Sequence, residues 1–127
     1  MRTAVINELK TITEFGNRVK EAFTAVAGYS TPYATVKMLE DPPDSRNKYG
    51  SFKGFQVFIY NSPDSFTTLD DLAKKVRAAL HNETLMTDDS PARFFTSNYV
   101  MTQGDFFDDK KNLFMKRVDF DFAIGRN

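Results

Sequence analysis

The feature that most limits the possible folds is an alternation of apolar and charged side chains over residues 113–124. One parity of this segment is apolar: Phe114, Val118, Phe120, Phe122 and Ile124. The other parity holds Arg117, Asp119 and Asp121. Because neighbouring side chains of a strand point to opposite faces, this pattern predicts an antiparallel strand with one face in solvent.

This strand is expected to be the second arm of a hairpin whose first arm is residues 93–103. The tip between the arms, residues 104–112, carries two aromatic rings among charged side chains. Both rings cannot easily enter one core if the segment is extended, and an aromatic anchor bordered by charges is typical of interfaces. We therefore predict interface roles for Asp105, Phe106, Phe107, Asp108 and Asp109, with packing of the rings onto the sheet as the alternative.

The N-terminal segment has the apolar spacing of an amphipathic helix over about residues 3–14, with Gly16-Asn17 as a stop signal. The same spacing can be continued through Val26. Residues 17–27 therefore stay open between helix and strand.

A second helix is predicted from Thr67 or Thr68, as the N-cap, to about His81. Its first turn would hold Asp70 and Asp71, and its buried stripe would be Leu69, Leu72, Val76 and Leu80. The cations Lys74, Lys75 and Arg77 are expected on a solvated face, and a charged His81 would suit the helix C-terminus.

Two further strands and two loops complete the pattern. Residues 33–39 and 52–60 are predicted strands, and the second has apolar residues on both parities, which favours the sheet centre. Residues 82–91 are expected to form a polar loop. The proline-containing loop 40–50 supplies further interface candidates: Arg46, Lys48 and Tyr49.

The order helix, strands, helix, hairpin lacks βαβ alternation and predicts an α+β fold. We expect an antiparallel or mixed sheet of about four to five strands with two helices packed on one face. The length of 127 residues fits one domain, residues 1–127.

Composition excludes several classes of function. The 17 basic and 17 acidic residues balance, which argues against nucleic-acid binding, and no run is long enough to span a membrane. The N-terminus does not resemble a signal peptide, and the absence of cysteine suits synthesis in a reducing cytoplasm. Thirteen Phe residues in so short a chain indicate either a Phe-rich core or apolar surface kept for partners.

The search for catalytic chemistry predicts no enzyme, no cofactor and no metal. His81 is the single histidine, and no nucleophile elbow or phosphate-binding glycine motif is present. The closest approach to a metal site is Asp105, Asp108 and Asp109, but EF-hand spacing is missing and two lysines follow at once.

Five segments together resemble the phage tail-completion or tail-terminator proteins of long-tailed phages. These segments are Pro32–Val36 (PYATV), Gly50–Val57 (GSFKGFQV), Leu69–Leu80 (LDDLAKKVRAAL), Gly104–Asp108 (GDFFD) and Lys116–Phe120 (KRVDF). In that family the segment around Arg18–Phe23 is a strand after a short first helix. We adopt this choice for the ambiguous region.

The resemblance implies a structural protein that caps the tail tube, ends its polymerisation and provides the tail-side surface for head joining. It implies a homo-hexameric ring, with the tail tube protein and a head-completion or connector protein as partners. The expected location is the head-proximal end of the virion tail, after synthesis in the cytoplasm of the host bacterium. The alternatives are a head-tail connector of the phage neck, a small metal-dependent hydrolase, and an adaptor that binds a peptide at a sheet edge.

Overall fold

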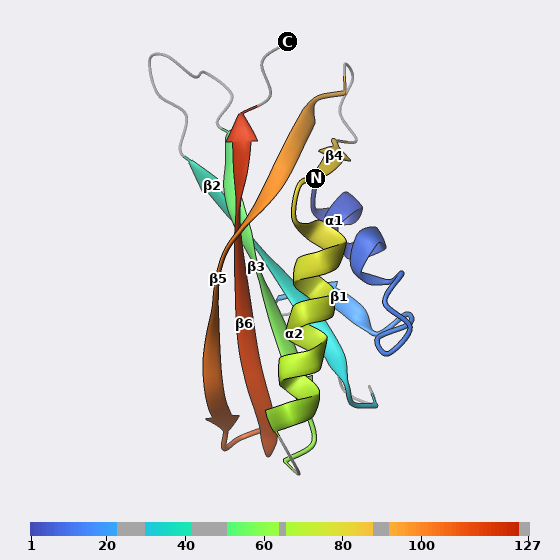
Figure 1. The fold of residues 1–127 in the computed structure, drawn as a ribbon, viewed down its shortest axis with the longest axis vertical. Helices are drawn as coiled ribbons and strands as arrows, with labels where there is room; N and C mark the ends of the chain where they lie inside the picture. Colours follow the sequence, from blue (N-terminus) through green and yellow to red (C-terminus); the bar gives the residue numbers. More distant parts are fainter. Residues whose placement is uncertain (23–29, 42–50, 64–65, 88–91, 125–127) are drawn as a thin grey trace.

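The computed structural model describes residues 1–22, 30–41, 51–63, 66–87 and 92–124. These residues form one mixed sheet of six strands, in the order β1-β2-β3-β6-β5-β4, with two helices (Figure 1). The elements are α1 (Arg2–Leu9), β1 (Val19–Glu21), β2 (Tyr33–Asp41), β3 (Ser51–Asn61), α2 (Phe66–Leu80), β4 (Glu83–Met86), β5 (Phe94–Asp108) and β6 (Leu113–Ile124). The predicted α+β class is confirmed, and the sheet has more strands than the four to five expected.

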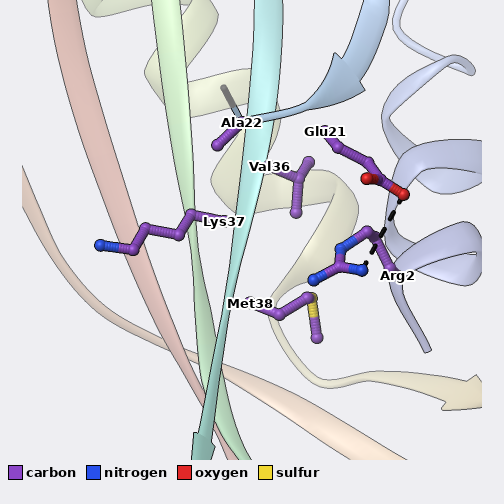
Figure 2. Close-up of a pocket in the computed structure, with 6 residues that line it drawn as sticks. All are labelled: Arg2, Glu21, Ala22, Val36, Lys37 and Met38. Atoms are coloured by element: carbon purple, nitrogen blue, oxygen red, sulfur yellow. Dashed lines mark ion pairs between the residues drawn. The ribbon is translucent and has the colours of Figure 1, made fainter. Parts of the chain in front are cut away.

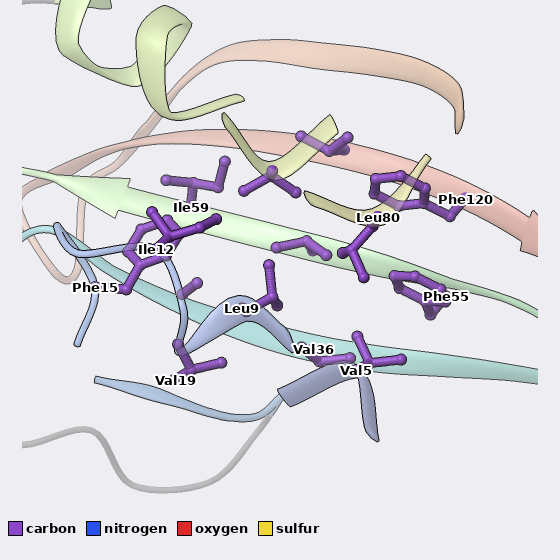
Figure 3. Close-up of a cluster of buried hydrophobic side chains, with 14 of the residues drawn as sticks. Val5, Leu9, Ile12, Phe15, Val19, Val36, Phe55, Ile59, Leu80 and Phe120 are labelled. Carbon is purple, nitrogen blue, oxygen red and sulfur yellow. The ribbon is translucent and has the colours of Figure 1, made fainter. Parts of the chain in front are cut away.

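Both helices cover the same face of the sheet, because each central strand gives one parity of its side chains to a single core. Phe55, Val57 and Ile59 of β3 are fully buried in this core, together with Val118 of β6. The buried side chains of α1 and α2 belong to the same cluster (Figure 3). The Phe55 and Phe120 rings stack with centroids 4.9 Å apart across the β3–β6 pair.

The first helix is shorter than predicted, because it ends at Leu9 and not near residue 14. The hydroxyl of Thr11 donates a hydrogen bond to the Glu8 carbonyl oxygen at 2.6 Å, so a side chain competes for an acceptor within the last turn. Successive turns follow, and they keep Phe15 fully buried before Gly16 adopts a positive φ of 54°. The apolar spacing therefore predicted the buried positions of this segment correctly, but the predicted C-terminal end of the helix was wrong.

Residues 19–21 form strand β1, which confirms the choice of a strand in the ambiguous region. This strand pairs in parallel with β2, where Val19 lies opposite Ala34, and makes the sheet mixed. Residues 23–29 lie outside the described part of the chain.

Strand β3 lies inside the sheet between β2 and β6, as its pattern predicted. Its second face is also partly covered, since Phe58 is half-buried and Tyr60 is buried. Gly54 is required at its position, because a Cβ there would lie 2.2 Å from the backbone oxygen of Phe120.

The second helix begins at Phe66, before the predicted cap. Asp70 and Asp71 therefore lie beyond its first turn, which contains no acidic residue. Phe66 is held at the start of the helix by Phe114 of β6, whose ring stacks on it at 4.0 Å. The predicted stripe is confirmed, since Leu69, Leu72, Val76 and Leu80 are all buried.

Strand β4 is a correction, because its four residues fall within the predicted polar loop 82–91. Only Leu85 of this strand is buried, so the segment has no readable periodicity. Strand β5 is also longer than its predicted arm and continues to Asp108, while β6 has the predicted bounds. The predicted tip is thus mostly strand. No helix among the described residues has the length and apolar character needed to cross a membrane.

Candidate assembly surface

The end of the β5–β6 hairpin is shaped by a bulge at Gly104 and Asp105. Both residues have positive φ angles, 142° and 79°, and the β5–β6 register shifts between Gly104 and Phe106. A Cβ on residue 104 would lie 2.9 Å from the Cα of Lys116, so this position also needs glycine. The bulge lets β5 continue beside β6 to the end of the hairpin, next to the start of α2 (Figure 1).

The two rings that follow the bulge lie on opposite faces of the sheet, as expected for adjacent strand residues. Phe107 pairs with Phe114 on the helix-covered face, and their rings meet edge to face at 6.0 Å. Phe106 pairs with Met115 on the other face. Phe106 is 45% exposed and Phe107 is 51% exposed. Neither ring is a core residue of the isolated chain.

Lys116 fixes this end of the hairpin to α2 by ion pairs with two carboxylates. Its Nζ lies 2.8 Å from Asp105 Oδ1 on the bulge and 3.0 Å from Asp70 Oδ1 on α2. Burial alone would lower the pKa of Lys116, but the hydrogen bonds and charges of Asp105 and Asp70 together raise it above its ordinary value. We call these three residues the lysine clamp.

The sequence reasoning gave Lys116 no role, although a signal was present. Lys116 has the same parity as Val118 and Phe120, which are both core residues. A lysine on the apolar parity of a half-buried strand indicates a buried charge that requires a partner. The partner Asp70 is distant in sequence, so only the fold identifies it.

The remaining predicted residues of the tip serve the turn. Asp108 Oδ1 accepts hydrogen bonds from the backbone N–H groups of Lys110 and Lys111, both at 3.1 Å, which closes the turn after β5. The Lys111 ammonium also lies 4.7 Å from the centre of the Tyr60 ring. Asp109 is exposed. The interface candidates Arg46, Lys48 and Tyr49 lie outside the described residues.

The large exposed apolar side chains gather on one margin of the sheet. Of the residues that the structure describes, those with this property are Met86, Phe94, Val100, Met101, Phe106 and Phe107. All of them belong to β4 or β5, the two strands at this margin. Met86 and Phe94 are also direct cross-strand partners. We call this row the apolar margin.

The side chains considered as candidates for catalysis or metal binding make structural contacts. His81 Nδ1 accepts a hydrogen bond from the backbone N–H of Tyr99 at 3.1 Å, so the imidazole joins the end of α2 to β5. Among the described residues no group of three or more His, Cys, Asp or Glu side chains is placed to hold a metal ion.

Exposed apolar side chains on a sheet margin are one feature of protein-protein interaction surfaces. Comparison with family models, with curated proteins and with solved structures gives no match to this chain.

Proposed function

We propose that this chain is a structural subunit of phage assembly that caps the tail tube, ends its polymerisation and offers a surface for head joining. The observation that carries the proposal is the apolar margin. Large apolar side chains exposed along the margin of a sheet are typical of surfaces that a partner covers, and an open strand edge pairs readily with other chains. A partner that covers β4 and β5 in the working state accounts for this composition.

The end of the hairpin supports the same proposal. Phe106 and Phe107 present rings on both faces of the sheet, and the lysine clamp holds the backbone beside them in one geometry. Anchors that are already rigid lose little entropy on binding. In the proposed homo-hexameric ring, this end contacts the neighbouring subunit or the tail tube protein, and the connector protein binds on the other side.

The test is the pair of variants Phe106→Ala and Phe107→Ala in a phage complementation assay. Each variant is expected to stay folded, to fail in ring formation or in docking to the tube, and to give tails of uncontrolled length in electron micrographs. Truncating an interface anchor commonly costs about 2 kcal/mol or more of binding. Phe55→Ala is the matched control, because Phe55 is fully buried and its loss should lower the melting temperature directly.

Three outcomes would contradict the proposal. If both tip variants melt as far below wild type as Phe55→Ala, the rings are core residues. Tails of normal length that lack heads would indicate a neck connector. Saturating Ca²⁺ or Mg²⁺ that raises thermal stability through Asp105 and Asp109 would favour the metal-dependent hydrolase.

A further inference from the structure

A groove lies between α2 and β5, just beyond Ser97, where the pairing of β5 with the first residue of β4 stops. It has a volume of about 300 Å³ and is lined by Asp70, Ala73, Lys74, Arg77, Tyr99 and Thr102. The helix supplies one wall, and the helix-covered face of β5 supplies the other. We call it the α2–β5 groove.

The groove carries an excess of positive charge. Two cations, Lys74 and Arg77, line the groove. The neighbouring Lys75 does not line it and forms an ion pair with Glu14. Asp70, the one carboxylate in the lining, is held by Lys116. Among the described residues no carboxylate forms an ion pair with Lys74 or Arg77.

Arg77 is exposed, and its guanidinium group lies over an aromatic ring. The guanidinium carbon is 4.2 Å from the centre of the Tyr99 ring, and the Tyr99 hydroxyl is 2.8 Å from the hydroxyl of Thr102. A guanidinium over a ring can still donate from its edge to a carboxylate in a bidentate manner. The groove thus presents a group suited to binding an anion.

Beside the groove, β5 has an edge that can accept another strand. β4 pairs with β5 only as far as Ser97, and no described strand pairs with the outer side of β5 beyond that residue. Residues 101–104 keep a regular register with β6 between the two shifts of β5. A strand added here would place alternate side chains over Arg77 on one face and beside Met101 on the other.

The charges argue against a second copy of this chain as the added strand. The opposite margin of the sheet also has a pocket, and its charged lining is Arg2, Lys37 and Glu21, with Glu21 paired to Arg2 at 3.9 Å (Figure 2). The lining of that pocket holds two cations and one carboxylate, so it offers no excess of carboxylates to Lys74 and Arg77. If two copies met groove to groove, Lys74 and Arg77 of one copy would face the same cations of the other.

We propose that the α2–β5 groove binds an extended strand of a different protein, one that alternates acidic with apolar residues and pairs with the outer edge of β5. The acidic residues are bound by Lys74 and Arg77, and the apolar residues on the other face cover Met101. The proposal rests on the proposed function in one respect, because both treat the β4–β5 side of the sheet as an interface. It assigns the chemistry of the protein that docks there.

The binding test uses three labelled peptides of about eight residues, which is longer than the regular segment 101–104 of β5 that they would pair with. The first alternates valine with glutamate, the second alternates valine with lysine, and the third is the first peptide with N-methyl groups on alternate amides. Fluorescence anisotropy with the purified full chain should show saturable binding of the first peptide alone. N-methylation removes donors of strand pairing and keeps the charge.

The matched variants separate the groove from general electrostatics. The double variant Lys74→Glu and Arg77→Glu should bind the glutamate peptide at least about tenfold more weakly, which corresponds to about 1.4 kcal/mol. Lys10→Glu removes an exposed cation just after α1 and should change the affinity less than about twofold. Circular dichroism and melting curves establish that each variant is folded.

Several results would overturn the proposal. Equal binding of the N-methylated peptide would exclude strand addition, and equal binding of the lysine peptide or of single-stranded DNA would exclude recognition of an acidic strand. Light scattering that shows wild-type oligomers dispersed by the double variant would make a second copy the occupant. No binding of the glutamate peptide would also overturn it, without affecting the tail-length test of Phe106 and Phe107.

Discussion

Replacing Lys116 by methionine removes the charge of the lysine clamp and keeps most of its packing. Lys116 is 9% exposed, whereas the side chains of Asp70 and Asp105 are 53% and 62% exposed. Both carboxylates can therefore return to water when the ammonium is absent. Ion pairs with exposed partners contribute about 0.2 to 1 kcal/mol each, and removing a buried charge recovers part of its desolvation cost. Lys116→Met should lower the free energy of unfolding by about 1 kcal/mol or less.

Lys116→Ala should cost more, because the buried methylene stem is lost as well. Three methylenes at about 0.8 kcal/mol each bring the total to about 2 to 3 kcal/mol. Urea denaturation of both variants, with unchanged slopes, measures the two values. Methionine should nevertheless speed amide hydrogen exchange at residues 105–108, since the bulge is no longer joined to α2. If Lys116→Met lost more than about 2 kcal/mol of unfolding free energy, as much as Lys116→Ala, then packing of the stem would not be the main contribution of Lys116 to stability.

Three further predictions concern the core and its titration. Leu72→Ala should lower the free energy of unfolding, measured in urea, by about 2 to 5 kcal/mol, and Val76→Ala should lower it by less. A loss of less than about 0.5 kcal/mol in both variants would show that this face of α2 is not the buried one. Gly54→Ala should lower the free energy of unfolding by more than about 2 kcal/mol, because the added Cβ would meet backbone atoms of β6. Gly16→Ala should lower it by about 1 kcal/mol, because that position has open space but a positive φ. Equal losses in the two variants would contradict the clash at Gly54. Burial, and the nearby Tyr60 and Asp108 charges, raise the pKa of Tyr33 from 10.0 to about 12. The unfolded chain therefore releases this proton first, stability falls as pH rises through that window, and Tyr33→Phe should flatten the fall in alkaline melting curves.

The elements that sequence predicted well are those whose periodicity reports burial directly. The stripe of α2 and the parity of β6 are long patterns, and the structure confirms both. β4 was missed because four residues with one buried side chain carry no period. The end of α1 was misplaced because the Thr11 hydroxyl competes within its last turn while the apolar spacing continues.

The candidate site was predicted by composition and corrected by geometry. Gly104 and Asp105 have the sequence character of a turn, but their positive φ angles form a bulge that keeps β5 extended to Asp108. The separation of Phe106 and Phe107 to opposite faces followed from strand geometry alone. The lysine clamp requires Lys116 to meet Asp70, and the groove requires Arg77 to meet Tyr99. These residues are distant in sequence, and no local pattern carries that information.

The position of β6 has a consequence for synthesis on the ribosome. β6 lies between β3 and β5 and so joins the two parts of the sheet, yet it follows the other five described strands in sequence. While residues 113–124 are still in the exit tunnel, β3 has an open edge, and Phe55 lacks the Phe120 ring that stacks on it. Until β6 emerges, the nascent chain therefore exposes pairing-competent edges and aromatic surface, which are the features that favour aggregation of incomplete chains.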